Sequence, residues 1–258
     1  MTNPHGSFIW YELLTSDADA AQAFYGKVVG WTAAPFAEGA NDYRVLSAPD
    51  GQGIGGLMTM PCEAGMGPAW LGYIGVDDVD ATVAGIEAAG GRVDMPAKDM
   101  EGVGRIAMVA DPQGVSFYVM KGASPEPSHA FATDVHGHCC WNELSTTDQG
   151  AALAFYSGLF GWTDGGGMPM GEAGTYQFIN QGDQMIGAMM PRTDGAPPLW
   201  TFYFEVPDIE VAAASVAAEG GTVHYGPAEV PGGDRIIVAS DPQGAMFGLV
   251  GPGQGEKA

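Results

Sequence analysis

Hydrophobic and polar positions along this chain follow two periods, and the whole pattern occurs twice. Helical spacing of apolar residues predicts a helix over 21–28 and another after Asp77 or Asp78. Asp17 and Asp78 suit helix N-termini, and Gly30 and Gly90 suit helix ends. Apolar runs and period-two alternation predict strands over 7–14, 43–47, 54–60, 70–76, 105–110 and 115–120. Each copy therefore has the plan strand, helix, strands, followed by the same series again.

The two copies correspond residue by residue. Matching segments in the first and second copies are His5-Gly6 and His136-Gly137, Phe24-Tyr25 and Phe155-Tyr156, Gly30-Trp31 and Gly161-Trp162, and Asp111-Pro112-Gln113-Gly114 and Asp241-Pro242-Gln243-Gly244. Copies of this length are domains, because the repeats of solenoids run about 20 to 50 residues. We therefore predict a domain over 1–122, a proline-containing linker over 123–134 and a second domain over 135–258.

Composition narrows the classes of partner. Acidic residues outnumber basic residues by 31 to 9, a net charge of −22, which disfavours binding to nucleic acid or to an anionic membrane. The sequence has no signal-peptide pattern and no apolar run near 18 residues. Its three cysteines, two of them adjacent, argue against a disulfide framework. We expect a cytoplasmic monomer or homodimer with a small-molecule ligand.

This plan resembles the vicinal oxygen chelate superfamily of glyoxalase I, bleomycin-resistance proteins and extradiol dioxygenases. The resemblance rests on Phe24-Tyr25 with Gly30-Trp31, Val76-Asp77-Asp78, Gly90-Gly91 and the Asp-Pro-Gln-Gly turn. Trp10-Tyr11-Glu12-Leu13 and Trp141-Asn142-Glu143-Leu144 look most like the tandem glyoxalase-like proteins of bacteria. The resemblance implies an α+β fold of two tandem glyoxalase-like domains, each of two paired β-α-β-β-β units that curl a sheet around a cup. The four units pair within each domain or are exchanged between the domains, and both arrangements fit the sequence.

Metal-dependent members of this superfamily hold one divalent ion in the cup. By the resemblance, the ligand positions fall on Trp10, Leu71 and Tyr118 in the first copy and on Trp141, Thr201 and Gly248 in the second copy. None of these side chains is a strong ligand for Ni²⁺, Zn²⁺ or Fe²⁺. We expect no metal ligands and no cofactor, while a divalent metal at another site stays open.

Three glutamates are the candidate catalytic residues. Period-two alternation places Glu12 and Glu143 on the same strand faces as Trp10 and Trp141, where burial favours the protonated carboxyl and suits a general acid or base. A structural carboxylate that accepts backbone or tyrosine hydrogen bonds fits equally well. Glu205, which replaces Gly75 of the first copy, either faces one cavity with Glu143 or is solvated.

Aromatic and thioether side chains are expected to line the cup and contact a flat organic ligand. The candidate substrate-binding residues are Trp10, Trp141, Tyr73, Tyr203, Tyr118, Met58 and Met189, although most such residues serve as core. An arginine at the rim would bind a substrate carboxylate, but pairing with the many acidic residues is the stronger expectation; the arginines considered are Arg44, Arg105, Arg192 and Arg235.

Two further motifs have simple explanations. His136, His138, Cys139 and Cys140 form a stretch rich in metal ligands, yet same-face positions along a strand lie about 7 Å apart, so core thiols with a surface histidine are preferred. The segment 51–56 satisfies the dinucleotide pattern G-x-G-x-x-G. Because a β-like apolar stretch follows it where a helix is required, the match is accidental and marks a turn.

Two functional hypotheses follow. The first is a glyoxalase-like lyase, isomerase or hydrolase that acts on a small aromatic or carbonyl compound by glutamate-mediated proton transfer, with Glu143 or Glu12 as the acid–base group. The second is a binding protein that sequesters a metabolite or antibiotic without chemistry. A third interpretation is that the first copy is a scaffold that only completes the assembly, since it has Gly75 where the second copy has Glu205.

Overall fold

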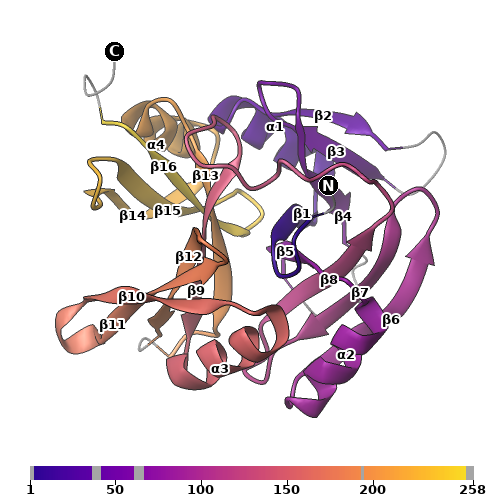
Figure 1. The fold of residues 1–258 in the computed structure, drawn as a ribbon. Coiled ribbons are helices and arrows are strands. Elements are labelled where there is room, and N and C mark those ends of the chain that lie inside the picture. The colour runs from indigo at the N-terminus through magenta and orange to yellow at the C-terminus, as the bar shows by residue number, and fades with distance from the viewer. Residues whose placement is uncertain (1–2, 37–41, 61–66, 193–194, 254–258) are drawn as a thin grey trace. The chain divides into compact units, whose positions relative to one another are not determined.

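The computed structural model describes residues 3–36, 42–60, 67–192 and 195–253 (Figure 1). The first copy forms β1 (Phe8–Thr15), α1 (Ala18–Val28), β2 (Thr32–Pro35), β3 (Tyr43–Ser47), β4 (Gly53–Thr59), β5 (Ala69–Gly75), α2 (Val79–Ala88), β6 (Arg92–Met100), β7 (Gly104–Ala110) and β8 (Ser116–Gly122). The second copy forms β9 (Cys139–Thr146), α3 (Gln149–Phe160), β10 (Thr163–Pro169), a 3₁₀ turn (Gly171–Ala173), β11 (Thr175–Gln181), β12 (Gln184–Pro191), β13 (Leu199–Glu205), α4 (Ile209–Ala218), β14 (Thr222–Glu229), β15 (Arg235–Ser240) and β16 (Met246–Gly251).

The strands of each copy form one eight-stranded sheet. The orders are β2-β3-β4-β1-β5-β8-β7-β6 and β10-β11-β12-β9-β13-β16-β15-β14. In each β-α-β-β-β module the first strand pairs in parallel with the last, as β1 does with β4 and β9 with β12. The other pairs within a module are antiparallel. This arrangement confirms the predicted α+β class and the β-α-β-β-β plan of the modules.

The helices begin where the sequence predicts. Asp17, Asp78, Asp148 and Asp208 each cap a helix by accepting a hydrogen bond from a backbone N–H three residues later. Such a cap satisfies one of the N–H groups that the first turn leaves without a partner. None of the described helices is long and apolar enough to cross a membrane.

The outermost strands are the ones that the hydrophobic pattern did not predict. In β6, half-buried residues alternate with exposed residues from Arg92 onward, and β14 is similarly exposed. Both strands lie at a sheet edge and carry register shifts. Because an edge strand buries little apolar surface, polar residues and proline are tolerated there and obscure the pattern.

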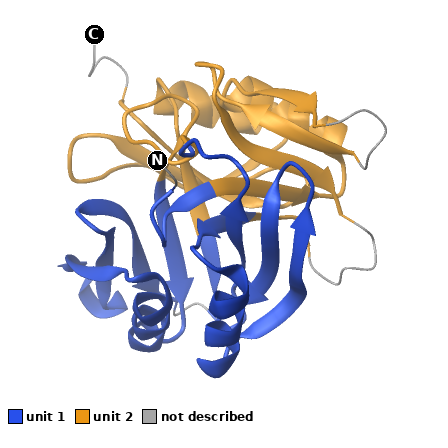
Figure 2. Ribbon diagram, turned by 45° about the vertical axis from the view of Figure 1, so that its right-hand side comes forward, with its two compact units in different colours: residues 1–9, 71–128, 141–200 blue, residues 10–70, 129–140, 201–258 orange. Residues whose placement is uncertain are grey.

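Compact units do not coincide with the sequence copies (Figure 2). Unit 1 contains residues 1–9, 71–128 and 141–200, whereas unit 2 contains residues 10–70, 129–140 and 201–258. Each unit therefore combines one module of the first copy with one module of the second copy. The sequence allowed modules to pair within a copy or to be exchanged between the copies. The compact units show the exchanged arrangement, in which modules of different copies are paired.

A buried tyrosine–aspartate hydrogen bond joins the two modules of each unit. In unit 2, the Tyr25 hydroxyl of α1 donates to Asp241 Oδ2 at 3.1 Å and accepts from the Trp70 indole N–H at 2.9 Å. In unit 1, Tyr156 makes the same bond to Asp111 at 3.2 Å. The two sequence motifs Phe-Tyr and Asp-Pro-Gln-Gly therefore recur because each Tyr of one copy binds the Asp of the other.

Gln113 connects the modules of unit 1 a second time. Its Oε1 accepts hydrogen bonds from the Thr146 hydroxyl, the Thr147 hydroxyl and the Asp148 N–H at 2.7, 2.7 and 2.8 Å. Its Nε2 donates to the Asp148 carbonyl at 2.9 Å. By contrast, the buried Oε1 of Gln243 in unit 2 has no hydrogen-bond partner among the described residues.

We expect Gln113→Ala to lower the free energy of unfolding by about 1–2 kcal/mol, because three donors at the start of α3 lose their acceptor. The matched variant Gln243→Ala is expected to lower the free energy of unfolding by less than about 0.5 kcal/mol, because the Oε1 atom of Gln243 accepts no hydrogen bond among the described residues. Urea unfolding followed by circular dichroism measures both changes. Equal losses for the two variants would contradict the role assigned to Gln113.

Candidate functional site

A chain of hydrogen bonds links Trp141, Tyr176 and Glu143 within unit 1. The Trp141 indole N–H donates to the Tyr176 hydroxyl at 2.8 Å, and this hydroxyl donates to Glu143 Oε2 at 2.6 Å. Glu143 is only 8% exposed, whereas the two aromatic rings are half-buried. We call these three residues the second relay, and they confirm that Glu143 and Trp141 lie on one face of β9.

The same arrangement occurs within unit 2. The Trp10 indole N–H donates to the Tyr43 hydroxyl at 2.9 Å, and Tyr43 is also hydrogen-bonded to Glu12. Glu12 is 3% exposed. We call Trp10, Tyr43 and Glu12 the first relay.

Strand register builds both relays. Glu143 on β9 lies beside Ala188 on β12, and Ala188 lies opposite Phe178 on β11, two residues from Tyr176. Residues two apart on a strand share a face, so the tyrosine projects from the same side as the carboxylate. The register of the first copy is equivalent, with Glu12 beside Gly56.

The relay tyrosines stay protonated. Burial, followed by the negative charge of Glu143, raises the pKa of Tyr176 above its ordinary value of 10.0. Burial and the charge of Glu12 raise the pKa of Tyr43 in the same way. Each tyrosine therefore remains a donor toward its glutamate, and the tryptophan N–H polarises the tyrosine hydroxyl that it binds. The arrangement holds a carboxylate in a nearly dry position beside a tyrosine hydroxyl that acts as a fixed donor, which suits proton transfer as well as a structural role.

Tyr43 and Tyr176 did not enter the sequence-based set of candidate site residues. They belong to the aromatic and thioether side chains that the sequence predicts mostly as core and otherwise as the lining of a cup. Their recurrence in both copies, on the strand two places from the glutamate strand, is the signal that identifies them. Trp10, Glu12, Trp141 and Glu143 are brought together with them as the relays.

Tyr73, Tyr118 and Tyr203 form separate aromatic contacts. In unit 1, the rings of Tyr73 and Tyr118 are stacked with centroids 4.2 Å apart. In unit 2, the ring of Tyr203 covers Gly248, where a methyl group would overlap it. All three tyrosines are buried, so their assignment to substrate binding stays a prediction.

The remaining candidates have different environments. Glu205 is half-buried at the end of β13, where its backbone pairs with Gly137 and His138, and its predicted pairing with Glu143 stays a prediction. Met58 is half-buried, and the strand register makes Met190 its counterpart. Met189 is fully buried and pairs with Leu144, on the face of the sheet opposite to Glu143.

The ligand positions implied by the resemblance do not fit a metal ion. The Trp10 and Trp141 N–H groups donate to tyrosines, and the ring of Tyr203 closes the position of Gly248. Leu71 is an apolar side chain and Thr201 a buried hydroxyl, neither of which is a strong ligand. Among the described residues, no group of three or more His, Cys, Asp or Glu side chains is placed to hold a metal.

The histidine–cysteine stretch is a packing element with one difference from expectation. Cys139 and Cys140 are buried thiols, and burial raises the pKa of Cys140. Cys62 lies outside the described residues. A surface histidine was expected here, but His138 is only 1% exposed. Its ring nitrogens lie 2.6 Å from the His129 carbonyl and 3.1 Å from Asp50 Oδ2, and these polar partners make its burial tolerable.

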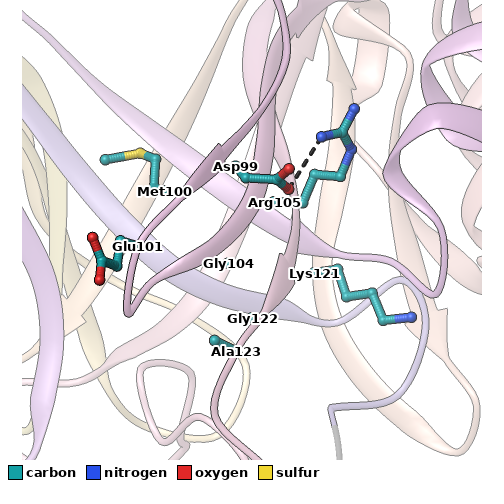
Figure 3. A pocket seen from close by; sticks show the side chains of 8 residues that line it. All are labelled: Asp99, Met100, Glu101, Gly104, Arg105, Lys121, Gly122 and Ala123. Atoms are coloured by element: carbon teal, nitrogen blue, oxygen red, sulfur yellow. Dashed lines mark hydrogen bonds and ion pairs between the residues drawn. The ribbon is translucent and has the colours of Figure 1, made fainter.

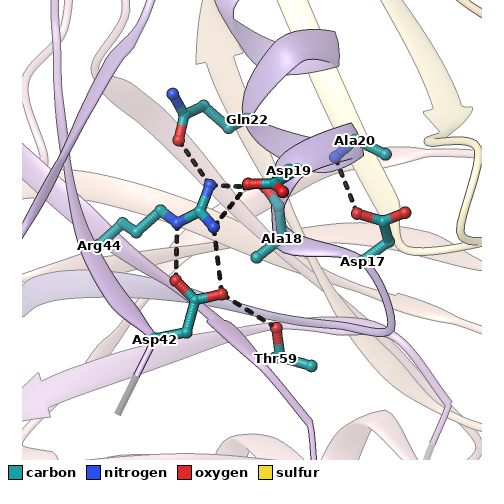
Figure 4. A network of polar contacts seen from close by, with 8 residues as sticks. All are labelled: Asp17, Ala18, Asp19, Ala20, Gln22, Asp42, Arg44 and Thr59. Carbon is teal, nitrogen blue, oxygen red and sulfur yellow. Dashed lines mark hydrogen bonds and ion pairs between the residues drawn. The ribbon is translucent and has the colours of Figure 1, made fainter. Parts of the chain in front are cut away.

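Arginines are held by acidic residues. Arg44 binds Asp42, Asp19 and Gln22 (Figure 4). Arg235 pairs with Glu210. These pairs follow the stronger sequence expectation, and their positive charges are already neutralised.

The structure also has an open hollow of about 520 Å³ at the turn between β6 and β7 (Figure 3). It includes Arg105, whose guanidinium binds Asp80 and Asp99, and Lys121. Apart from Arg105, one of the arginines considered for binding a substrate carboxylate, none of the predicted site residues lines the hollow. The relays, with their buried carboxylates, are therefore the better candidate site.

Comparisons with known proteins agree with this fold. The chain is 38% identical over 250 residues to "Putative glyoxylase CFP32" of Mycobacterium tuberculosis, with 94% of each chain covered. It is 32% identical to "Anthracycline biosynthesis protein DnrV" of Streptomyces peucetius, in an alignment that covers 95% of this chain and 93% of the other chain. Its fold is similar to that of the Mn(II)-bound glyoxalase from Novosphingobium aromaticivorans, with a TM-score of 0.67, 18% identity, and coverage of 96% of this chain and 82% of that chain.

A family model matches both copies of the repeat. The model for the "Glyoxalase/Bleomycin resistance protein/Dioxygenase superfamily" aligns with residues 7–119 and again with residues 136–249. Together these segments contain both relays and all four modules except the last residues of β8 and β16. The chain therefore belongs to the glyoxalase/bleomycin resistance protein/dioxygenase superfamily.

Proposed function

We propose that this glyoxalase-like protein catalyses proton transfer on a small carbonyl compound, with a relay glutamate as the acid–base group and without a bound metal ion. The observation that carries the proposal is the 2.6 Å hydrogen bond from Tyr176 to a glutamate that is only 8% exposed. A carboxylate with limited access to water, held in place by a donor that does not ionise, is preorganised to accept a proton.

The reaction step is an enolisation. The glutamate carboxylate takes a proton from the carbon next to a carbonyl group, so that a C–H bond breaks and an O–H bond forms. The electron pair of the C–H bond moves onto the carbonyl oxygen as an enolate. Return of the proton to another position isomerises the substrate, and no oxidant or reductant is needed.

The relatives' names support this chemical class. One relative is named a glyoxylase, and another is named for anthracycline biosynthesis. Both names point to chemistry on small organic molecules, and the half-buried aromatic rings of Trp141 and Tyr176 suit contact with such a ligand. A cytoplasmic monomer or homodimer with such a ligand stays the expectation from the sequence.

The test is solvent exchange of α-hydroxyketones, with 2-hydroxyacetophenone as the aromatic probe and hydroxyacetone as the aliphatic probe. In D₂O, the protein is expected to accelerate loss of the α-proton signal in proton NMR spectra. The double variant Glu12→Gln with Glu143→Gln is expected to lose at least about 100-fold of that rate, because general-base catalysis contributes about 10²–10⁴-fold. Glu101→Gln, on an exposed turn, is the matched control.

Two outcomes would contradict the proposal. Probe binding without any exchange would remove the acid–base role and favour sequestration. Exchange that survives the double variant would assign the proton transfer to a group other than the relay glutamates. Exchange that disappears after chelator treatment and returns with Mn²⁺ would contradict the metal-free part alone.

A further inference from the structure

The first relay is built as completely as the second. Tyr43 receives the Trp10 N–H at 2.9 Å and binds Glu12, which is even less exposed than Glu143. Burying a carboxylate costs free energy unless it is hydrogen-bonded, and the Tyr43 hydroxyl supplies a hydrogen bond to Glu12. The first relay therefore has the features on which the proposed function rests.

Gly56 makes room for the first relay. A methyl group at Gly56 would overlap the Tyr43 hydroxyl, whereas one at Gly53 would only reach ordinary contact with the Trp10 ring, at 3.5 Å. Gly56 belongs to the segment 51–56 that matches the dinucleotide pattern by accident. Within β4, this glycine instead lets the Tyr43 side chain lie close to the strand.

The two relays differ in the residues beside the glutamate. In the first copy, Glu12 lies beside Gly56 on the next strand, and Gly56 lies beside Val45 on the third strand. In the second copy, the residues at these two positions are Ala188 and Phe178. The difference is largest on the third strand, where an aliphatic residue stands in one copy and an aromatic residue in the other.

Phe178 adds a third ring to the second relay. Its ring lies 6.1 Å from Trp141 and 5.8 Å from Tyr176, both at an interplanar angle of 81°. Phe178 is half-buried, and edge-to-face rings of this kind form apolar walls that favour a further aromatic group. Val45 offers no ring to the first relay, where the nearest additional ring is that of the exposed Phe36, which contacts Tyr43 at 6.1 Å from outside the three neighbouring strands.

We propose that the chain carries two non-equivalent acid–base sites, one at Glu12 and one at Glu143, and that the Glu143 site prefers aromatic substrates. This inference rests on the proposed function, since it assigns the same proton transfer to both relays. It goes further by giving the first copy its own activity and by naming Phe178 and Val45 as the residues that set the difference in selectivity.

The two single glutamate variants test the inference with the same pair of probes. Glu143→Gln is expected to remove most of the exchange of 2-hydroxyacetophenone, and Glu12→Gln is expected to remove the larger share of the exchange of hydroxyacetone. Phe178→Val in the Glu12→Gln background is expected to lower the aromatic-to-aliphatic rate ratio by about 2- to 10-fold, the size of one aromatic contact. Val45→Phe in the Glu143→Gln background is expected to raise that ratio.

The outcomes separate this inference from the proposed function. If one single variant abolishes exchange of both probes and the other matches the unmodified protein, only one copy is active, and the inference is wrong while the proposed function holds. If both single variants keep the same probe ratio, the sites are equivalent and the selectivity assignment is wrong. If the double variant keeps full exchange, the proposed function itself fails. Urea unfolding of each variant, compared with Glu101→Gln, excludes loss of the fold as the cause.

Discussion

Replacing Asp241 with alanine is expected to lower the free energy of unfolding by about 3–5 kcal/mol, because three buried donors lose their acceptor. Asp241 is 3% exposed. Its Oδ1 accepts from the N–H groups of Gln243 and Ala245 at 2.9 Å each, and its Oδ2 accepts from the Tyr25 hydroxyl. The Tyr25 bond joins modules from different copies, so its loss weakens the assembly of unit 2 as well as the local turn.

Urea unfolding measures this change, and amide hydrogen exchange shows which compact unit opens. Asp111→Ala is expected to cause a similar loss in unit 1, since Asp111 makes the equivalent bonds to Gln113, Val115 and Tyr156. Asp99→Ala is the control, because Asp99 is exposed and pairs only at the surface with Arg105. An effect of Asp241→Ala no larger than that of the control would refute the role of this bond.

The Asp241 contribution is expected to depend on pH. Burial is the largest cause that raises the pKa of Asp241 above 3.8 in the folded protein. The Asp241 carboxyl therefore binds its proton more tightly in the folded protein than in the unfolded chain. Its contribution to stability is complete below the pKa that it has in the unfolded chain, and this contribution is lost as the pH rises through its pKa in the folded protein. The stability difference between the unmodified protein and Asp241→Ala should therefore be larger at about pH 4 than at about pH 7.

Gly56→Ala is expected to dismantle the first relay and to destabilise the protein by about 2–4 kcal/mol. The added methyl group occupies the place of the Tyr43 hydroxyl, and the nearest ring carbons are too close for a small adjustment. When the ring moves away, the Trp10 N–H loses the Tyr43 hydroxyl as its acceptor, and the buried Glu12 loses its hydrogen bond to that hydroxyl. Exchange at the Glu12 site is expected to fall with it.

The indole N–H signals of ¹⁵N-labelled protein report this change directly. The Trp10 signal should shift in Gly56→Ala, while the Trp141 signal stays in place. The reverse substitution in the second copy, Ala188→Gly, is the control and is expected to cost only about 0.5–1 kcal/mol, the usual effect of glycine in a strand. An unchanged Trp10 signal in Gly56→Ala would show that Tyr43 does not occupy the position described.

Much of the fold follows from local signals. The four capping aspartates, the apolar inner strands and the Asp-Pro-Gln-Gly turn all agree with the structure because each depends on neighbours in the sequence. The edge strands β6 and β14 were not predicted, since little apolar surface marks them. The sequence also did not determine which modules pair, because local sequence patterns do not show that Tyr25 binds Asp241 and that Tyr156 binds Asp111.

The site was predicted in part for the same reason. Alternation along β1 and β9 placed each glutamate beside its tryptophan. Tyr43 and Tyr176 come from another strand, and only the sheet register brings their hydroxyls to the carboxylates. The burial of His138 likewise depends on Asp50 and on the His129 carbonyl, which local patterns do not reveal.

The exchange of modules also imposes an order on synthesis of the chain. The Tyr156–Asp111 bond of unit 1 joins residues 45 positions apart, whereas the Tyr25–Asp241 bond of unit 2 spans 216 positions. A nascent chain leaves the ribosome from its N-terminus, so synthesis must pass residue 241 before Tyr25 can meet Asp241. Contacts of such long sequence separation form slowly and leave apolar surface exposed in the meantime. Residues 10–70, although made early, are therefore the part of this protein that waits longest for its partner and most needs protection from aggregation.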